Sequence, residues 1–145
     1  MKFADFHPGQ VITLGPASLT ERQIIDFARE YDPQWFHTDP EAAAQGQWGG
    51  LIASGWQTCA LAMRLVYDNL LAGSESIGSP GVKNLMWPSP VRPDEPLRMR
   101  VEVLEVRRSK SKPLLGILRW HWQLLQADDR HALDVDVTSF FDLGA

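Results

Sequence analysis

The sequence predicts an α+β fold in which a curved antiparallel β-sheet wraps around one long helix. Apolar residues recur at helical spacing through residue 71, whereas they alternate with polar residues from residue 82 onward. One of the predicted helices is apolar around most of its circumference, so it needs to be enclosed. The length of 145 residues suits a single domain with a sizeable core.

A short strand and a first helix begin the chain. Residues 1–10 predict an N-terminal strand or loop, and the apolar run at 11–14 predicts a short strand. Thr20 stands three positions before a glutamine, which is the form of a capping box, so a helix starts there. Because Pro33 restricts the backbone of the residue before it, this helix ends at Asp32.

Two further helices follow in the first half. Asp39 can cap a short helix, and the glycine-rich segment 46–50 ends it. The longest helix covers residues 55–71, which corresponds to roughly 25 Å at 1.5 Å per residue. Ser54 and Gln57 have the form of a second capping box at its start.

The second half of the chain has the alternation of strands with one buried and one solvated face. The alternation shifts its phase at Leu104, which predicts a bulge, and the polar segment 127–130 predicts a hairpin turn. Exposed sheet edges favour association with another copy of the chain. The predicted strands cover residues 82–87, 97–106, 118–124 and 133–141.

The composition excludes several classes of function. A net charge of −4 offers no basic surface for nucleic acid, and no segment approaches the roughly 20 apolar residues that span a bilayer. The N-terminus has no apolar run typical of a signal peptide, so we expect a cytoplasmic protein. Cys59 is the only cysteine and cannot form an internal disulfide. His, Cys and carboxylate residues lack metal-ligand spacing, so no metal is expected.

The stretch between the first and the longest helix holds the candidate chemistry. Asp32 and His37 lie five positions apart and could move protons as an acid and a base. The helix that starts at Gly55 has unpaired N–H groups and partial positive charge there, so it can stabilise developing negative charge. Taken singly, Asp32 suits an Asp-Pro turn and His37 a half-buried histidine. Their combination with the helix start favours a catalytic site.

Three segments of the chain follow one another in the order of a known family's motifs. Residues 31–43, YDPQWFHTDPEAA, are followed by GGLIASGW at 49–56 and by PVRPDEPL at 90–97. These segments resemble, in turn, the hydratase motif, the helix start and the PV-x-x-G-D-x-L turn of MaoC-like dehydratases. The resemblance implies one hot-dog domain over residues 1–145.

The resemblance also implies an activity, because the family includes (R)-specific enoyl-CoA hydratases, which add water across a 2-enoyl thioester. Carried over by position, Asp32 and His37 are the acid–base pair, and the N–H group of Gly55 polarises the thioester carbonyl. The substrate-binding residues expected beside them are Phe36, Ser54 and Trp56.

The expected reaction uses no cofactor, since coenzyme A enters only as part of the substrate. The expected partners are an acyl-CoA or acyl-carrier thioester and further copies of the chain in a homodimer or higher homo-oligomer, with no nucleic acid and no membrane. Lys110 and Lys112, with arginines nearby, could meet the phosphates of coenzyme A, although a solvated turn is the better interpretation.

Departures from the family's pattern leave two alternatives open. Gln34 and Trp35 replace the usual Asn and Pro, Ser54 replaces a His, and Met63 replaces a Ser. A protein that binds acyl thioesters without turnover is therefore one alternative. A hot-dog thioesterase is a weaker one, because that chemistry usually has a carboxylate on the central helix and residues 55–67 contain none.

Overall fold

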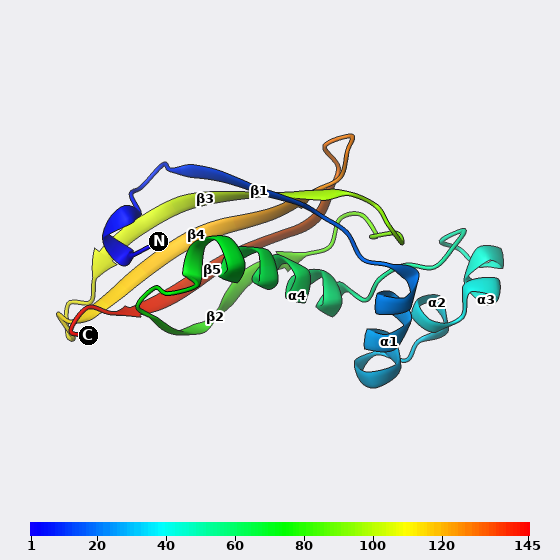
Figure 1. The fold of residues 1–145 in the computed structure, drawn as a ribbon, viewed down its shortest axis with the longest axis horizontal. Helices are drawn as coiled ribbons and strands as arrows, with labels where there is room; N and C mark the ends of the chain where they lie inside the picture. Colours follow the sequence, from blue (N-terminus) through cyan, green and yellow to red (C-terminus); the bar gives the residue numbers. More distant parts are fainter.

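Five antiparallel strands form one curved sheet, and a long helix lies along one face of it (Figure 1). The computed structural model describes all residues 1–145. The strands are β1 (Val11–Ala17), β2 (Ser76–Met86), β3 (Leu97–Arg108), β4 (Leu115–Leu125) and β5 (His131–Asp142). The helices are α1 (Glu21–Tyr31), α2 (Trp35–Thr38), α3 (Pro40–Gln45) and α4 (Gly55–Val66), with a 3₁₀ turn at Phe3–Asp5. The sheet order is β1-β3-β4-β5-β2, which confirms the predicted α+β fold.

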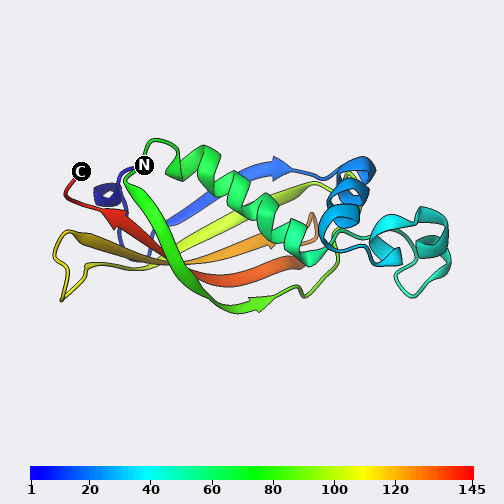
Figure 2. The same ribbon diagram turned by 90° about the horizontal axis from the view of Figure 1, so that it is seen from below.

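Alternation along the central strands creates the core. Every second residue is buried along β4, β5 and the first half of β3, as Trp120, Val135 and Val101 illustrate, and mostly polar residues alternate with them. The buried side chains join Ala62 and Val66 of α4 in one apolar cluster. Figure 2 shows α4 lying across this face of the sheet. The opposite face remains polar, as the sequence pattern predicted.

Several local predictions are confirmed, and others need correction. Thr20 caps α1 through the predicted capping box, and the register of β3 shifts between Val103 and Glu105, where the bulge was expected. The one-turn helix α2 was not predicted, because four residues are too few for a periodic signal. Strand β2 begins earlier than predicted, since its glycine-rich first half hides any alternation.

The long helix is less enclosed than its apolar pattern suggested. It is α-helical to Val66 and continues as a π-helical turn over Tyr67–Leu71. The side chains of Trp56, Met63 and Tyr67 are exposed, so the expectation of full enclosure is wrong for the single chain. The reason is that one sheet covers only one side of a helix.

Three short helices gather beyond one end of the sheet, where α4 begins (Figure 1). The two chain termini and the turn between β3 and β4 lie at the other end. None of the helices combines the length and the apolar character that crossing a membrane requires. The candidate residues at the end of α1, in α2 and at the start of α4 therefore come from elements that meet at one end of the sheet.

Candidate active site

The structure brings Asp32 and His37 into direct contact. Asp32 ends α1 as its C-cap and His37 lies in α2, with Oδ2 of the carboxylate 3.2 Å from Nε2 of the ring. His37 is only 5% exposed, and its Nδ1 lies 2.7 Å from the carbonyl oxygen of Ile52. Because a carbonyl can only accept a hydrogen bond, Nδ1 carries a proton and Nε2 faces the carboxylate. The ring is thus anchored at one nitrogen and presented to Asp32 at the other.

Two further donors hold the carboxylate of Asp32. The hydroxyl of Ser54 donates to Oδ2 and the side-chain amide of Gln34 donates to Oδ1, each at 2.7 Å. Burial by itself raises the pKa of Asp32, but these two hydrogen bonds and the neighbouring ring of His37 outweigh it, so the pKa lies below its ordinary value. Asp32 is therefore ionised at neutral pH.

The backbone N–H groups at the start of α4 have no side-chain cap in this arrangement. Ser54 is the N-cap residue, yet its side chain makes no capping bond, so the predicted capping box with Gln57 is wrong. Its hydroxyl serves Asp32 instead. The backbone N–H groups of Gly55 and Trp56 donate no hydrogen bond within the chain. A Cβ at Gly55 would overlap the indole of Trp87, so packing as well as helix geometry requires glycine there.

A cavity of about 210 Å³ opens beside these groups. His37 and Gly55 both line it, so the imidazole and the N-terminus of α4 face the same space. Asp32 is not among the lining residues and adjoins the cavity through its contact with His37. We call this cavity the reaction chamber. It combines an imidazole, free backbone donors and a nearby carboxylate.

The remaining predicted substrate contacts fall elsewhere. Phe36 packs its ring edge-on against the ring of His37, with centroids 4.4 Å apart, and does not line the chamber. Trp56 lines a neighbouring groove. Thr58 and Trp87 line the chamber and were missed. Thr58 lies one helical turn after Gly55, so helical spacing could have placed it on the chamber side of α4. Trp87 follows β2, and nothing in its neighbouring sequence indicates that it reaches the chamber.

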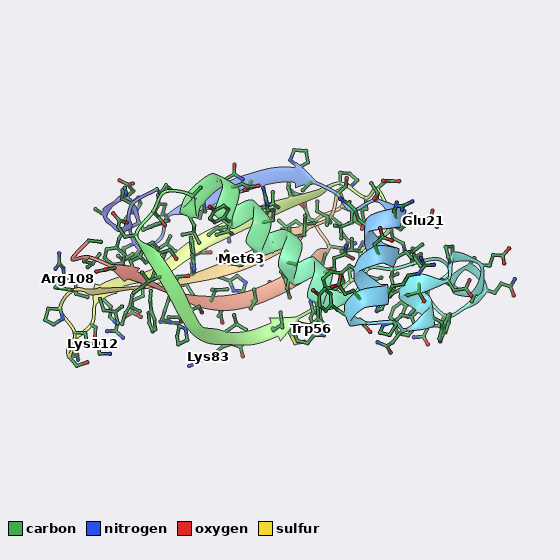
Figure 3. The ribbon with its side chains drawn as sticks, turned by 60° about the horizontal axis from the view of Figure 1, so that its bottom comes forward. Glu21, Trp56, Met63, Lys83, Arg108 and Lys112 are labelled. Atoms are coloured by element: carbon green, nitrogen blue, oxygen red, sulfur yellow. The ribbon has the colours of Figure 1, made fainter.

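Two other candidate features lie away from the chamber. Asp68, the first carboxylate after the start of α4, forms an ion pair with Arg64 at 2.7 Å near the far end of the helix. Arg108 and Lys112 lie at the end of the molecule opposite Glu21 of α1 (Figure 3). Within one chain, therefore, neither the thioesterase carboxylate nor the basic turn reaches the chamber. No group of three or more His, Cys, Asp or Glu residues is placed to hold a metal ion.

Comparison with known proteins identifies the family. Residues 4–117 match the MaoC-like domain, which is most of the chain. The chain belongs to the MaoC-like dehydratase family. Its fold is that of a MaoC-like dehydratase from Rhodospirillum rubrum, whose crystal structure aligns with a TM-score of 0.85 at 33% identity over 96% of this chain and 94% of the other. Both have the hot-dog fold.

Two curated relatives of this MaoC-like protein come from bacteria. The uncharacterized protein YdeM of Bacillus subtilis is 36% identical over 118 residues, which cover 81% of this chain and 82% of YdeM. The 3-hydroxyacyl-thioester dehydratase Z of Mycobacterium tuberculosis is 36% identical over 76 residues. That match covers 51% of this chain and 50% of the dehydratase, so it spans only about half of each protein.

Proposed function

We propose that this MaoC-like protein is an acyl-thioester hydratase/dehydratase that adds or removes water at a 2-enoyl thioester. The observation that carries the proposal is that His37 and the free N–H group of Gly55 share one chamber, with the carboxylate of Asp32 touching His37. Hydration of an activated alkene needs a base for water, an acid for the α-carbon and donors for the enolate oxygen. The site offers one group for each requirement.

The proposed reaction follows from the protonation of these groups. The ionised carboxylate of Asp32, which adjoins the chamber through His37 and keeps its side chain 17% exposed, takes a proton from water as the water oxygen adds to the β-carbon. The electron pair of the double bond moves to the thioester oxygen, and the enolate that forms is stabilised by the N–H group of Gly55. His37 in its protonated form gives a proton from Nε2 to the α-carbon. Proton transfer across the 3.2 Å between Asp32 and His37 then restores both groups, and dehydration is the reverse.

Replacement of either member of the pair tests this mechanism. Asp32→Asn and His37→Ala are each expected to lower the rate of crotonyl-CoA hydration by about 10²–10⁴, the usual contribution of positioned proton transfer. The assay follows the loss of the enoyl absorbance, and circular dichroism checks that the variants remain folded.

The chain offers a matched control on the solvated face of the sheet. His121 also lies 2.7 Å from an aspartate, Asp136, but far from the chamber, so His121→Ala should retain the wild-type rate. Wild-type rates in both Asp32→Asn and His37→Ala would refute the mechanism. Saturable binding of crotonyl-CoA without loss of the enoyl absorbance would identify a non-catalytic binder, and release of free thiol would identify a thioesterase.

We also propose that the protein acts as a homodimer, in the cytoplasm and without a cofactor beyond the coenzyme A of its substrate. The edge strand β2 exposes apolar residues, among them Ile77 and Val82. Ile77→Glu should shift the mass measured by light scattering from dimer toward monomer. Val11→Glu, an exposed aliphatic residue on the opposite edge strand β1, is the control and should leave the mass unchanged.

A further inference from the structure

A second hollow adjoins the reaction chamber. It has a volume of about 290 Å³ and lies between α4, β2 and the central strands, and nine of its ten lining residues are hydrophobic. We call it the apolar groove. Its lining includes Trp56, Cys59 and Met63 of α4, Val82 and Leu85 of β2, and Val135 of β5.

The chamber and the groove are neighbours that share no lining residue. On α4, Gly55 lines the chamber and the next residue, Trp56, lines the groove. On β5, Ala132 lines the chamber and the next residue, Leu133, lines the groove. The boundary between the two hollows therefore passes between adjacent residues on both elements.

Two tryptophans stand at this boundary. The indoles of Trp56 and Trp87 meet edge to face, with centroids 5.1 Å apart and planes at 83°. Trp87 lines the chamber and packs against Gly55, whereas Trp56 lines the groove. The side chain of Trp56 is 59% exposed and that of Trp87 is 41% exposed, so the pair is not part of the buried core. Figure 3 shows Trp56 near the end of β2, on the same helix as Met63.

We infer that the Trp56–Trp87 pair closes the far end of the acyl site and restricts this protein to short acyl chains. The inference rests on the proposed function, because it assigns the chamber to the reacting thioester. The chamber is the smaller of the two hollows, at about 210 Å³, and the indole of Trp87 lines it where it meets the groove. A short acyl group therefore suits the chamber, and a longer chain has to pass the tryptophan pair.

The groove is the space that a longer chain would need. Its volume of about 290 Å³ exceeds that of the chamber. Its lining suits an alkyl chain, since almost all of it is apolar. The tryptophan pair therefore determines whether the site accepts only short acyl chains or also long ones. Removal of either indole would connect the groove to the chamber.

Kinetics on 2-enoyl-CoA substrates of four, eight and twelve carbons test the inference. In the wild type, kcat/KM should fall at least tenfold from four to eight carbons. Trp56→Ala and Trp87→Ala should each raise the ratio of kcat/KM for eight carbons to that for four carbons at least tenfold. Tyr67→Ala is the control, because Tyr67 is an exposed aromatic residue that follows α4 and lines neither hollow, and it should leave this ratio near the wild-type value.

A binding measurement separates the inference from the proposed function. Calorimetry with butyryl-CoA and octanoyl-CoA involves no hydration, so it reports on the acyl site even if the wild type turns over no enoyl-CoA. Octanoyl-CoA should bind at least tenfold more tightly to Trp56→Ala than to the wild type, while butyryl-CoA binding changes little. Equal preference for both acyl groups in the wild type, or an unchanged preference in both folded variants, overturns the inference.

Discussion

Removal of the Ser54 hydroxyl tests how the site keeps Asp32 ionised. Ser54 is fully buried, and its hydroxyl donates to Oδ2 of Asp32 at 2.7 Å. A hydrogen bond to a charged group contributes about 1.5–3 kcal/mol, so Ser54→Ala should lower the free energy of unfolding by about that amount. For a domain near this size, 1 kcal/mol shifts Tm by about 2–4 °C, which gives a decrease of roughly 3–12 °C. Differential scanning calorimetry measures this change.

The same substitution should move the pH dependence of catalysis. The hydroxyl stabilises the ionised carboxylate, so its loss raises the pKa of Asp32 toward its ordinary value. Because the proposed mechanism needs the ionised form, the acid limb of the kcat/KM profile should shift to higher pH.

A second buried serine separates the two effects of Ser54→Ala. Ser139 accepts a hydrogen bond from the indole N–H of Trp120, far along the sheet from the chamber. Ser139→Ala should lower Tm but leave the acid limb in place. An unmoved acid limb in a folded and active Ser54→Ala variant would refute the assignment of Asp32 as the base.

Two further predictions follow from the contacts of Gly55 and of the polar sheet face. Gly55→Ala should reduce kcat/KM at least tenfold, because its Cβ would overlap Trp87, and adding Trp87→Ala should restore part of the loss with crotonyl-CoA. Burial raises the pKa of Asp136, but hydrogen bonds from Asn84 and His121 outweigh it and the pKa is lowered. Asp136 therefore stabilises the fold above the pKa of unfolded aspartate, and this stabilisation is lost as pH falls below about 4. In Asp136→Asn, the decrease of Tm with acid should be smaller, and an identical decrease would contradict this reasoning.

The strands of the sheet were predictable from the sequence because the alternation of apolar and polar residues is visible within each segment. A residue such as Trp120 is buried because alternation places it on the α4 face, and the bulge at Leu104 follows from a break in that alternation. The proximity of Asp32 and His37 was also expected, because only residues 32–34 connect the end of α1 to the start of α2. Prediction failed where a contact comes from a distant segment, as with Trp87 in the chamber.

Ser54 shows why local rules mispredict a functional site. Its sequence context fits a capping box, and an isolated helix would use the hydroxyl to cap its own N–H groups. In the fold, the hydroxyl of Ser54 points to the ionised carboxylate of Asp32, 22 positions away along the chain, and donates to it, so its oxygen does not accept from an N–H group of its own helix. The helix N–H groups then remain free to meet a substrate oxygen. The N–H group of Trp56, which a capping hydroxyl could have engaged, is therefore free, and that of Gly55 is free because the first residue of a helix has no partner within it.

The departures from the family motif bear on substrate choice rather than on the chemistry. Gln34 and Ser54, which replace the usual Asn and His, both donate to Asp32, so the carboxylate keeps a donor on each oxygen. Met63, which replaces a Ser, lies in the apolar groove and not in the chamber. A pure binding protein has no use for a carboxylate held ionised against a buried imidazole, since partial burial of a charge is costly unless it is compensated. The contact between Asp32 and His37, beside a groove lined by Met63, is what the proposed hydratase with the inferred acyl preference requires.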